Sequence, residues 1–284
     1  MSQSTNLRAL MQDFSLEMTG KDVEALREAA PSIPQGTRVN VTFLGNENLA
    51  MRVTAAKTAK ELGFIPVPHI SARRLQNQDE LNDFLQALTD VGALQYVFAV
   101  GGDPPEPMGP YGSSLEMLQS SLFKDFGVKE VSIAGYPEGH PEISDEVLFH
   151  ELKAKLELLS QRDLPARILT QFGFDTDPIA TWLNKLAEAN ITTPVGIGVP
   201  GPAGIKRLLS YARRFGAAAS AGIVKKYGFS LSNLMGSAGP DKFLANLADV
   251  VAASKYQGSV GVHFYTFGGM VKTAEWAKDC TNKL

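Results

Sequence analysis

Two hydrophobic patterns alternate along the whole chain. Short apolar or alternating runs are typical of β-strands, whereas apolar residues that recur every three or four positions are typical of helices. The first pattern predicts eight strands, at residues 13–18, 38–43, 64–70, 96–100, 130–135, 166–172, 193–199 and 259–265. The second predicts helices at 21–30, 48–62, 79–91, from 113 onward, around 147–159, at 178–189, from after 202 to 215, at 217–227, 240–255 and 270–278.

Local signals mark several of the element boundaries. Gly63 follows the second helical stretch and is a usual helix end. The sequence Ser113-Ser-Leu-Glu116 offers a capping box for the helix after the fourth strand. Two prolines within 64–70 predict irregular ends for the third strand.

Eight strands that each lead into a helix favour a single (β/α)₈ barrel over residues 1–284, with extra helices before the last strand. An open, doubly wound sheet is the alternative. It is disfavoured because no Gly-x-Gly-x-x-Gly follows the first strand and no linker divides the chain into two lobes.

Composition narrows the classes of protein that fit. The 284 residues are 44% hydrophobic and 20% charged, with a net charge of −3 and no basic block, so nucleic acid is not an expected partner. The sequence has no apolar run of eighteen residues, and its polar start lacks the features of a signal peptide, so we expect a cytoplasmic protein without a membrane segment. Cys280 is the only cysteine, which excludes an internal disulfide and a cysteine-based metal cluster.

The fourth strand shows how chemistry is placed in this chain. Tyr96-Val-Phe-Ala-Val100 is stopped by two glycines, Asp103 and two prolines, so Asp103 is expected on a stiff loop at the strand's end. An isolated aspartate there would most simply cap the turn. Polar residues recur, however, at the ends of the other strands, where barrel enzymes place their active sites. These residues are Glu17, Thr42, His69, Asp103, Tyr136, His140, Gln171, His263 and Tyr265.

These strand ends form one rim of the predicted barrel, and its residues suit some kinds of site better than others. The histidines are scattered singly, without the close spacing of metal-binding pairs, so no metal is expected. No Ser/His/Asp combination is recognisable. Gly201 and Gly204 after the seventh strand offer only a weak phosphate-binding signal. Glu17 and Asp103 are two carboxylates suited to general acid work.

Four stretches together resemble the methylenetetrahydrofolate reductase family, and they occur in the family's order over nearly the whole chain. They are Gly102-Asp-Pro-Pro105, Ala134-Gly-Tyr-Pro-Glu-Gly-His-Pro-Glu142, Thr170-Gln-Phe-Gly-Phe-Asp175 and Val262-His-Phe-Tyr-Thr266. The resemblance implies a flavin-binding barrel in which Glu17 is the general acid and Asp103 lies near the flavin and the pterin. The implied cofactor-binding residues are Thr42, His69, Gly102, Asp103, Gly112, Tyr136, His140 and Lys155.

The resemblance also implies substrate contacts, which fall at Gln171, Arg207, Tyr211 and Tyr265. Two departures from the family pattern stand out. Met18-Thr-Gly20 replaces the aromatic residues and prolines that follow the glutamate, and Gly269 replaces an arginine.

The activity that this resemblance implies is the interconversion of 5,10-methylenetetrahydrofolate and 5-methyltetrahydrofolate with NADH or NADPH. The implied mechanism is ping-pong, by hydride transfer through FAD. Two alternatives remain open: a folate- or flavin-binding barrel without reductase activity, and a flavin-free, methyltransferase-like barrel that binds folate. The expected partners are small molecules, and a homo-oligomer is left open.

Overall fold

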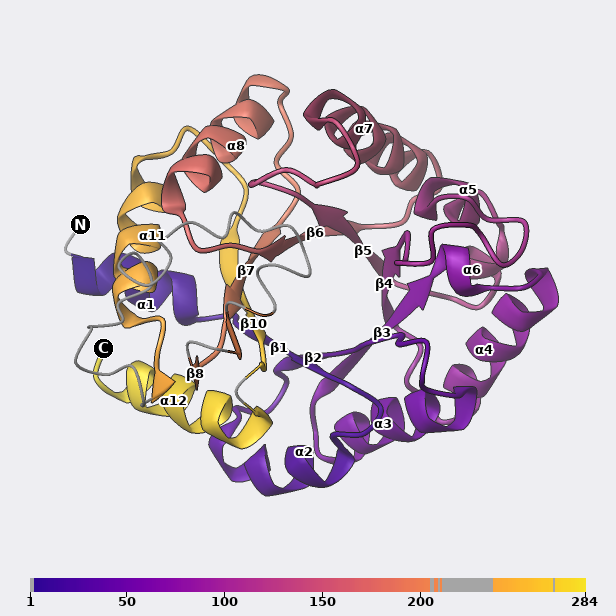
Figure 1. Cartoon of the computed structure of the whole chain (residues 1–284), viewed down its shortest axis with the longest axis horizontal. Helices are drawn as coiled ribbons and strands as arrows, with labels where there is room; N and C mark the ends of the chain where they lie inside the picture. Colours follow the sequence, from indigo (N-terminus) through magenta and orange to yellow (C-terminus); the bar gives the residue numbers. More distant parts are fainter. Residues whose placement is uncertain (1–2, 205–206, 209, 211–236, 268) are drawn as a thin grey trace.

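Eight parallel strands close into a barrel in a computed structural model that describes residues 3–204, 207–208, 210, 237–267 and 269–284 (Figure 1). Around the barrel the order is β1-β10-β7-β6-β5-β4-β3-β2. The barrel strands are β1 (Ser15–Met18), β2 (Arg38–Val41), β3 (Ile65–Ser71), β4 (Tyr96–Val100), β5 (Glu130–Gly135), β6 (Ala166–Phe172), β7 (Val195–Pro200) and β10 (Val260–Tyr265). The predicted (β/α)₈ barrel is therefore confirmed.

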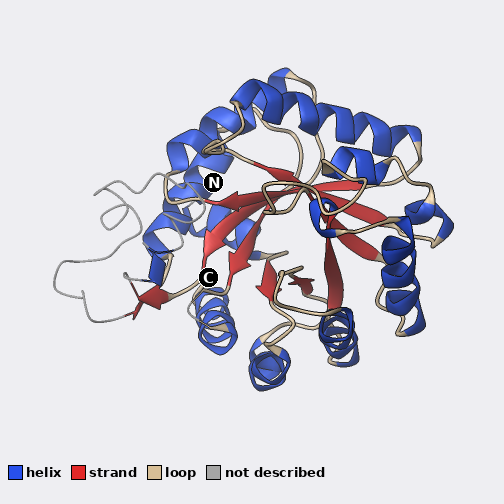
Figure 2. Ribbon diagram, turned by 45° about the vertical axis from the view of Figure 1, so that its right-hand side comes forward, coloured by secondary structure: helices blue, strands red, loops and turns tan. Residues whose placement is uncertain are grey.

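Helices surround the barrel, as Figure 2 shows in blue around the red strands. They are α1 (Gln3–Met11), α2 (Val23–Ala29), α3 (Leu49–Glu61), α4 (Gln78–Asp90), α5 (Ser114–Leu118), α6 (Leu122–Asp125), α7 (Asp145–Gln161), α8 (Thr176–Glu188), α11 (Asp241–Ala253) and α12 (Met270–Asn282). Two short strands, β8 (Ala203–Gly204) and β9 (Ser237–Ala238), pair antiparallel outside the barrel.

Most predicted helix boundaries hold. Gly63 takes a positive φ of 85°, as a helix-ending glycine does. The Ser113 hydroxyl accepts a hydrogen bond from the Glu116 backbone N–H, while the Glu116 carboxylate reaches one residue further back, to the backbone N–H of Gly112.

Three sequence expectations need correction or lie outside the described residues. Helix α1 was missed, although Leu10 and Met11 are buried where it packs against α11 and β10. The helix expected directly after residue 202 does not begin there, because Ala203 and Gly204 form β8. Of the extra helices expected before the last strand, 240–255 is confirmed as α11, whereas 217–227 lies outside the described residues.

The prolines of β3 lie inside the strand rather than at irregular ends. The Ile65 backbone N–H bonds to Thr37 on the β2 side, and the pairing of β3 with β4 starts only at His69. Pro66 and Pro68 precede that pairing, so the N–H groups that they lack are not needed by the ladder with β4.

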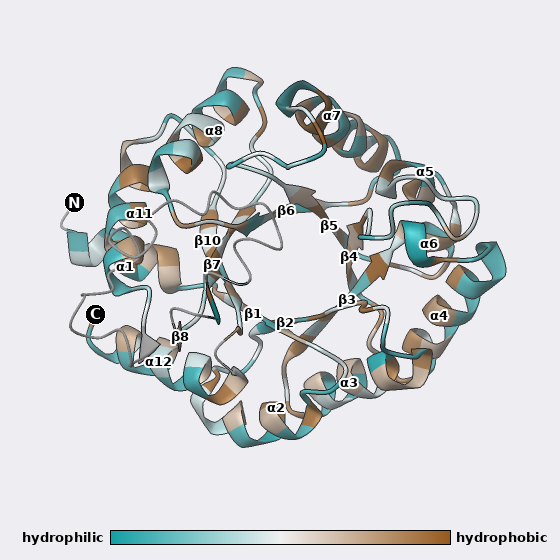
Figure 3. Cartoon of the chain, viewed as in Figure 1, coloured by the Kyte–Doolittle hydropathy of each residue, from teal (hydrophilic) through white to brown (hydrophobic). Residues whose placement is uncertain are grey.

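Alternating residues of the strands divide the apolar side chains into two cores. Val67, Phe98 and Leu169 form a small cluster of their own within the barrel. The larger cluster includes Leu16, Val97 and Phe264, which pack with the helices. Helix surfaces turned toward the barrel are accordingly the browner ones in Figure 3. Because the inner core is small, the positions nearer the C-terminal strand ends are left for polar side chains.

Candidate active site

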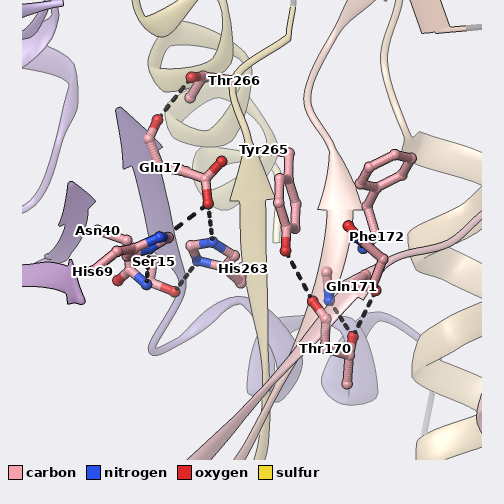
Figure 4. A network of polar contacts seen from close by, with 11 residues as sticks. Ser15, Glu17, Asn40, His69, Thr170, Gln171, Phe172, His263, Tyr265 and Thr266 are labelled. Carbon is pink, nitrogen blue, oxygen red and sulfur yellow. Dashed lines mark hydrogen bonds and ion pairs between the residues drawn. The ribbon is translucent and has the colours of Figure 1, made fainter. Parts of the chain in front are cut away.

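Glu17 lies on β1 with two histidines from other strands beside its carboxylate (Figure 4). Its Oε2 atom is 3.6 Å from Nε2 of His263 on β10 and 3.9 Å from Nε2 of His69 on β3. Only 16% of the Glu17 side chain is exposed, and that of His263 is fully buried. The closed barrel brings these three strands together, although the residues lie up to 246 positions apart in sequence.

Ser15 fixes the ring of His263 from the opposite side. Its hydroxyl oxygen is 2.8 Å from His263 Nδ1. Ser15 and Glu17 share a face of β1 because side chains alternate along a strand, and the register pairs Ser15 directly with His263. The backbone carbonyl of Glu17 accepts a hydrogen bond of 2.7 Å from the Thr266 hydroxyl. Contacts between β1 and the segment of β10 and Thr266 therefore fix both the Glu17 carboxylate and the His263 imidazole.

His69 is held as a neutral ring. The pKa of His69 is lowered to about 4, mainly because the ring is buried; Glu17 opposes this shift, and His263 adds to it. Its Nε2 atom lies 3.4 Å from the amide nitrogen of Asn40 on β2. His69 therefore presents an uncharged polar edge to the mouth at neutral pH.

The segment after Glu17 is organised by a buried carboxylate rather than by aromatic residues and prolines. Glu47 Oε1 accepts a hydrogen bond of 2.7 Å from the Gly20 backbone N–H, and Glu47 Oε2 lies 3.4 Å from that of Leu44. A Cβ atom on Gly20 would lie only 3.2 Å from the Glu47 carboxyl carbon. The segment Met18-Thr-Gly20, which differs from the family pattern, is therefore held in place by the hydrogen bond between Gly20 and Glu47.

Asp103 is placed differently from Glu17. Its side chain is 65% exposed and forms an ion pair with Arg74, which belongs to a 3₁₀ turn directly after β3. The neighbouring Arg73 donates hydrogen bonds to the carbonyl oxygens of Pro104, Pro105 and Gly112, which fixes the loop. The two carboxylates that the sequence suggested for acid work are therefore not brought into contact.

Two buried hydroxyls near the mouth have no hydrogen-bond partner among the described residues. They are those of Thr42, directly after β2, and Ser71, at the end of β3. Gly102 has a φ of 99°, and a Cβ atom there would come within 2.2 Å of the Ser71 hydroxyl oxygen. A buried hydroxyl without a partner is costly, so these groups fit a polar ligand edge that approaches the ends of β2 and β3.

The predicted loop after β5 carries two polar rings in contact. Tyr136 and His140 meet edge to face with centroids 5.5 Å apart. His140 Nδ1 accepts a hydrogen bond from the backbone N–H of Glu142. Burial raises the pKa of the Tyr136 hydroxyl, which keeps that group neutral.

Lys155 lies on α7 and already has an anionic partner. Its ammonium nitrogen is 3.7 Å from the Glu151 carboxylate, and only 13% of its side chain is exposed. Burial lowers the pKa of Lys155, whereas Glu151 counteracts that shift.

The predicted folate-side residues are only partly assembled. Tyr265 donates to the Thr170 carbonyl and its ring contacts that of His263, so it borders the Glu17 group. Burial raises the pKa of Tyr265 well above its ordinary value. Gln171 uses its amide oxygen locally, as the acceptor for the Phe172 backbone N–H. Arg207 is exposed and donates to the carbonyl of Phe267, and Tyr211 lies outside the described residues.

Sequence reasoning missed Ser15, Asn40, Glu47 and Arg74. Ser15 and Asn40 carried a usable signal, because each lies two residues before a predicted rim residue and therefore on the same strand face. Glu47 and Arg74 lie in loops, where no periodicity reports which way a side chain points.

Gly269, the second departure from the expected pattern, directly precedes α12. Its φ of 114° is a backbone conformation that glycine adopts readily and other residues rarely do. This local backbone therefore does not suit the arginine that the family resemblance would place there.

Two kinds of feature are absent from the described residues. No three histidine, cysteine, aspartate or glutamate side chains in that part of the chain are grouped so that they could hold a metal ion. None of the described helices combines the length and apolar character needed to cross a membrane.

The fold and the rim define a (β/α)₈ barrel with a carboxylate–histidine site at the C-terminal ends of its strands. The family model for methylenetetrahydrofolate reductase matches residues 12–269. The chain therefore belongs to the methylenetetrahydrofolate reductase family.

Relatives with established names are distant in sequence. The chain is 27% identical to 5,10-methylenetetrahydrofolate reductase of Pectobacterium carotovorum over 178 residues, which cover 61% of this chain and 57% of that protein. It is 26% identical to the Salmonella typhimurium enzyme of the same name over 234 residues, covering 80% and 75%.

One solved structure extends the likeness in fold. An uncharacterised Clostridium thermocellum protein, described as binding two copies of 5-methyl-5,6,7,8-tetrahydrofolic acid, aligns with a TM-score of 0.59 and 10% identity. The alignment covers 97% of this chain and 98% of that protein. At this identity it supports the barrel fold alone.

Proposed function

We propose that this protein interconverts 5,10-methylenetetrahydrofolate and 5-methyltetrahydrofolate, with NADH or NADPH as the other substrate and residues 1–284 as one flavin-binding barrel. The observation that carries the proposal is the Glu17 carboxylate, which lies within 4 Å of two imidazoles at the mouth of a barrel of this family. Ring opening of the methylene bridge needs a proton at the leaving nitrogen, and a largely enclosed carboxyl group is suited to deliver it.

Residues near the ends of β2, β3 and β5 would hold a bound FAD. The unpartnered hydroxyls of Thr42 and Ser71 offer hydrogen bonds, and Gly102 leaves space that a side chain would fill. The bound FAD would supply the carrier that accepts hydride from the nicotinamide and passes it to the folate, in a ping-pong sequence. The residues proposed to hold it are Thr42, His69, Gly102, Asp103, Gly112, Tyr136, His140 and Lys155.

Glu17 acts on the folate, in this proposal, with help from its neighbours. When His263 donates its Nδ1–H to the Ser15 hydroxyl, its Nε2 atom is left as an acceptor that faces Glu17. A protonated Glu17 would then be oriented by His263 on one side and by the neutral His69 on the other. The carboxyl group gives its proton to the substrate nitrogen and is reprotonated through its exposed edge.

The substrate would be oriented by the other residues of the rim. Gln171, Arg207, Tyr211 and Tyr265 are the residues that we propose to contact the folate or the nicotinamide. Because burial holds Tyr265 neutral, its phenol would act by hydrogen bonding and contact rather than as an anion.

A second candidate is a folate-binding barrel that works without flavin. It is motivated by Lys155, since this lysine, which the family resemblance implies as a cofactor-binding residue, is already paired with Glu151. An absorbance spectrum of the purified, FAD-supplemented protein separates the candidates. The reductase proposal predicts a flavin band that bleaches under anaerobic NADH or NADPH and returns with methylenetetrahydrofolate. A colourless protein that takes up no FAD would contradict it and favour the second candidate.

A further inference from the structure

The strand that carries Asn40 lies between those of Glu17 and His69. Neighbouring strands β1, β2 and β3 supply the three side chains, which Figure 4 shows together. Asn40 is the register partner of Glu17 and is only 1% exposed. Its amide nitrogen is 3.4 Å from His69 Nε2, and the same ring atom is 3.9 Å from Glu17 Oε2. Asn40 therefore contacts the ring nitrogen that faces the carboxylate.

The His69 ring is fixed in this orientation. It meets the ring of Phe98 edge to face, with centroids 4.7 Å apart, and only 9% of its side chain is exposed. Its Nδ1 atom makes no hydrogen bond to any residue in the described part of the chain. Among those residues, Asn40 is therefore the hydrogen-bond partner that decides which ring nitrogen carries the proton.

An amide nitrogen leaves only one choice. A neutral imidazole has one N–H donor and one acceptor nitrogen, and an amide NH₂ group can only donate. Because Asn40 donates to Nε2 of His69, the ring proton lies on Nδ1. Ser15 is different, since its hydroxyl can either donate to His263 or accept from it and does not by itself select a tautomer.

The Asn40 amide is costly in one respect. Its Oδ1 atom is buried and has no hydrogen-bond partner within the described residues. A buried polar atom without a partner is unfavourable, and an apolar side chain of similar size would remove that cost. The feature that an asparagine supplies here, and a leucine would not, is the contact with His69.

We infer that Asn40 is a positioning residue for Glu17, because it holds His69 as the Nδ1–H tautomer with Nε2 as an acceptor. In this state His69 cannot donate a hydrogen bond to the Glu17 carboxylate, so it does not stabilise the ionised form. The proton of Glu17 is thereby kept for the substrate nitrogen. The tautomer follows from the geometry, whereas its effect on turnover rests on the proposed folate reaction.

Nitrogen-15 NMR of the histidine-labelled protein reads the tautomer directly, because protonated and unprotonated ring nitrogens have well-separated chemical shifts. The chain has four histidines, and His69→Asn identifies the signals of His69. At pH 7.5 the ring is neutral, since burial lowers the pKa of His69 to about 4. We expect the proton to be on Nδ1 in the parent protein.

Two variants change what position 40 offers to the ring. Asn40→Leu removes the donor, and Asn40→Asp replaces it with an acceptor of the same shape. Both should place a proton on Nε2 of His69, where the Glu17 carboxylate can accept a hydrogen bond from it. The matched control is Asn184→Leu, which removes an amide on α8 that accepts from the Lys255 backbone N–H and should leave the His69 signals unchanged.

The effect on the reaction is followed in the two half-reactions. Asn40→Leu should slow reoxidation of the flavin by methylenetetrahydrofolate about tenfold, as expected for one altered hydrogen bond to a charged group. Reduction by NADH or NADPH should keep the parent rate, whereas a general loss of structure would slow both steps. A thermal unfolding curve for each variant confirms that it is folded before rates are compared.

A parent ring protonated at Nε2 would overturn the inference, since the amide oxygen of Asn40 would then face the ring. So would a proton that stays on Nδ1 in both variants, or a tautomer that changes without slowing reoxidation. A parent protein that binds no flavin, or whose flavin the folate does not reoxidise, contradicts the proposed function instead. The NMR signals still decide in that case whether Asn40 holds the ring.

Discussion

Two carboxylates near the barrel mouth, Glu17 and Asp103, are held in opposite ways. Glu17 lies on a strand and is mostly enclosed, and among the described residues its carboxylate lies beside two imidazoles. Asp103 lies on a loop, is mostly exposed, and is neutralised by Arg74. Charge interactions are strong where water is excluded and weak where it is not. In the proposed mechanism, this difference favours Glu17 for proton transfer and leaves Asp103 a positional or electrostatic role.

The largest effect should follow removal of the Glu17 proton. Glu17→Gln keeps the size of the side chain but cannot act as an acid, so steady-state turnover of methylenetetrahydrofolate should fall by about 10²–10⁴-fold. The same chemical change at the other carboxylate, Asp103→Asn, is the matched control. If the two variants lost equal activity, the contrast between the carboxylates would be wrong.

The next effect concerns stability and pH. The pKa of His69 is lowered from 6.5 to about 4 in the folded protein, so between these values the unfolded chain binds more protons and stability falls as pH falls. Over that window the free energy of unfolding should decrease by about 3 kcal/mol from this group. Urea titrations at pH 7.5, 6.5 and 5.5 measure the slope.

His69→Asn should flatten that pH dependence, since the titrating ring is gone. Carboxylates contribute little above pH 5.5, which keeps the comparison within the range of histidine. An unchanged slope in the variant would show that His69 is not the group responsible.

Ser15→Ala should have a smaller but still measurable effect. It removes the only described hydrogen-bond partner of the buried His263 ring, which costs about 1–3 kcal/mol of stability. If Ser15 positions the imidazole for Glu17, the pH profile of folate turnover should also shift. Ser132→Ala, at a buried serine on β5, is the control and should leave that profile in place.

The smallest effect is expected at the exposed carboxylate. Asp103→Asn should retain FAD and lower folate turnover by about tenfold, because a charge-assisted contact is replaced by a neutral one. Arg74→Gln removes the ion-pair partner of a carboxylate that is 65% exposed, so loss of this pair should change stability by less than about 1 kcal/mol. Turnover equal to the parent in Asp103→Asn would return Asp103 to the role of a turn residue.

The strands of the barrel were predictable because buried parallel strands leave continuous apolar runs in the sequence. Helix α1 was not predicted, since its residues are mostly polar and only Leu10 and Met11 are fully buried. The short β8–β9 pair has no periodic pattern long enough to detect.

At the site, position along a strand was a better guide than residue type. Glu17, His69 and His263 were all predicted at the rim, and closure of the barrel brings them together. Asp103 was predicted at the same rim. The orientation of its side chain, however, depends on its ion pair with Arg74 and on the hydrogen bond from Arg73 to the loop, and no sequence pattern reveals these contacts. Loop geometry is therefore where sequence reasoning was weakest.

The central claim, that Glu17 is the acid for the folate step alone, is tested most directly in an anaerobic stopped-flow spectrometer. Reduction of the bound flavin by NADH or NADPH needs no proton from Glu17, so Glu17→Gln should bleach at the parent rate. Reoxidation by methylenetetrahydrofolate should slow by about 10²–10⁴-fold. Equal slowing of both steps would show that Glu17 supports the fold or the cofactor site, and unchanged rates in both would place the acid elsewhere.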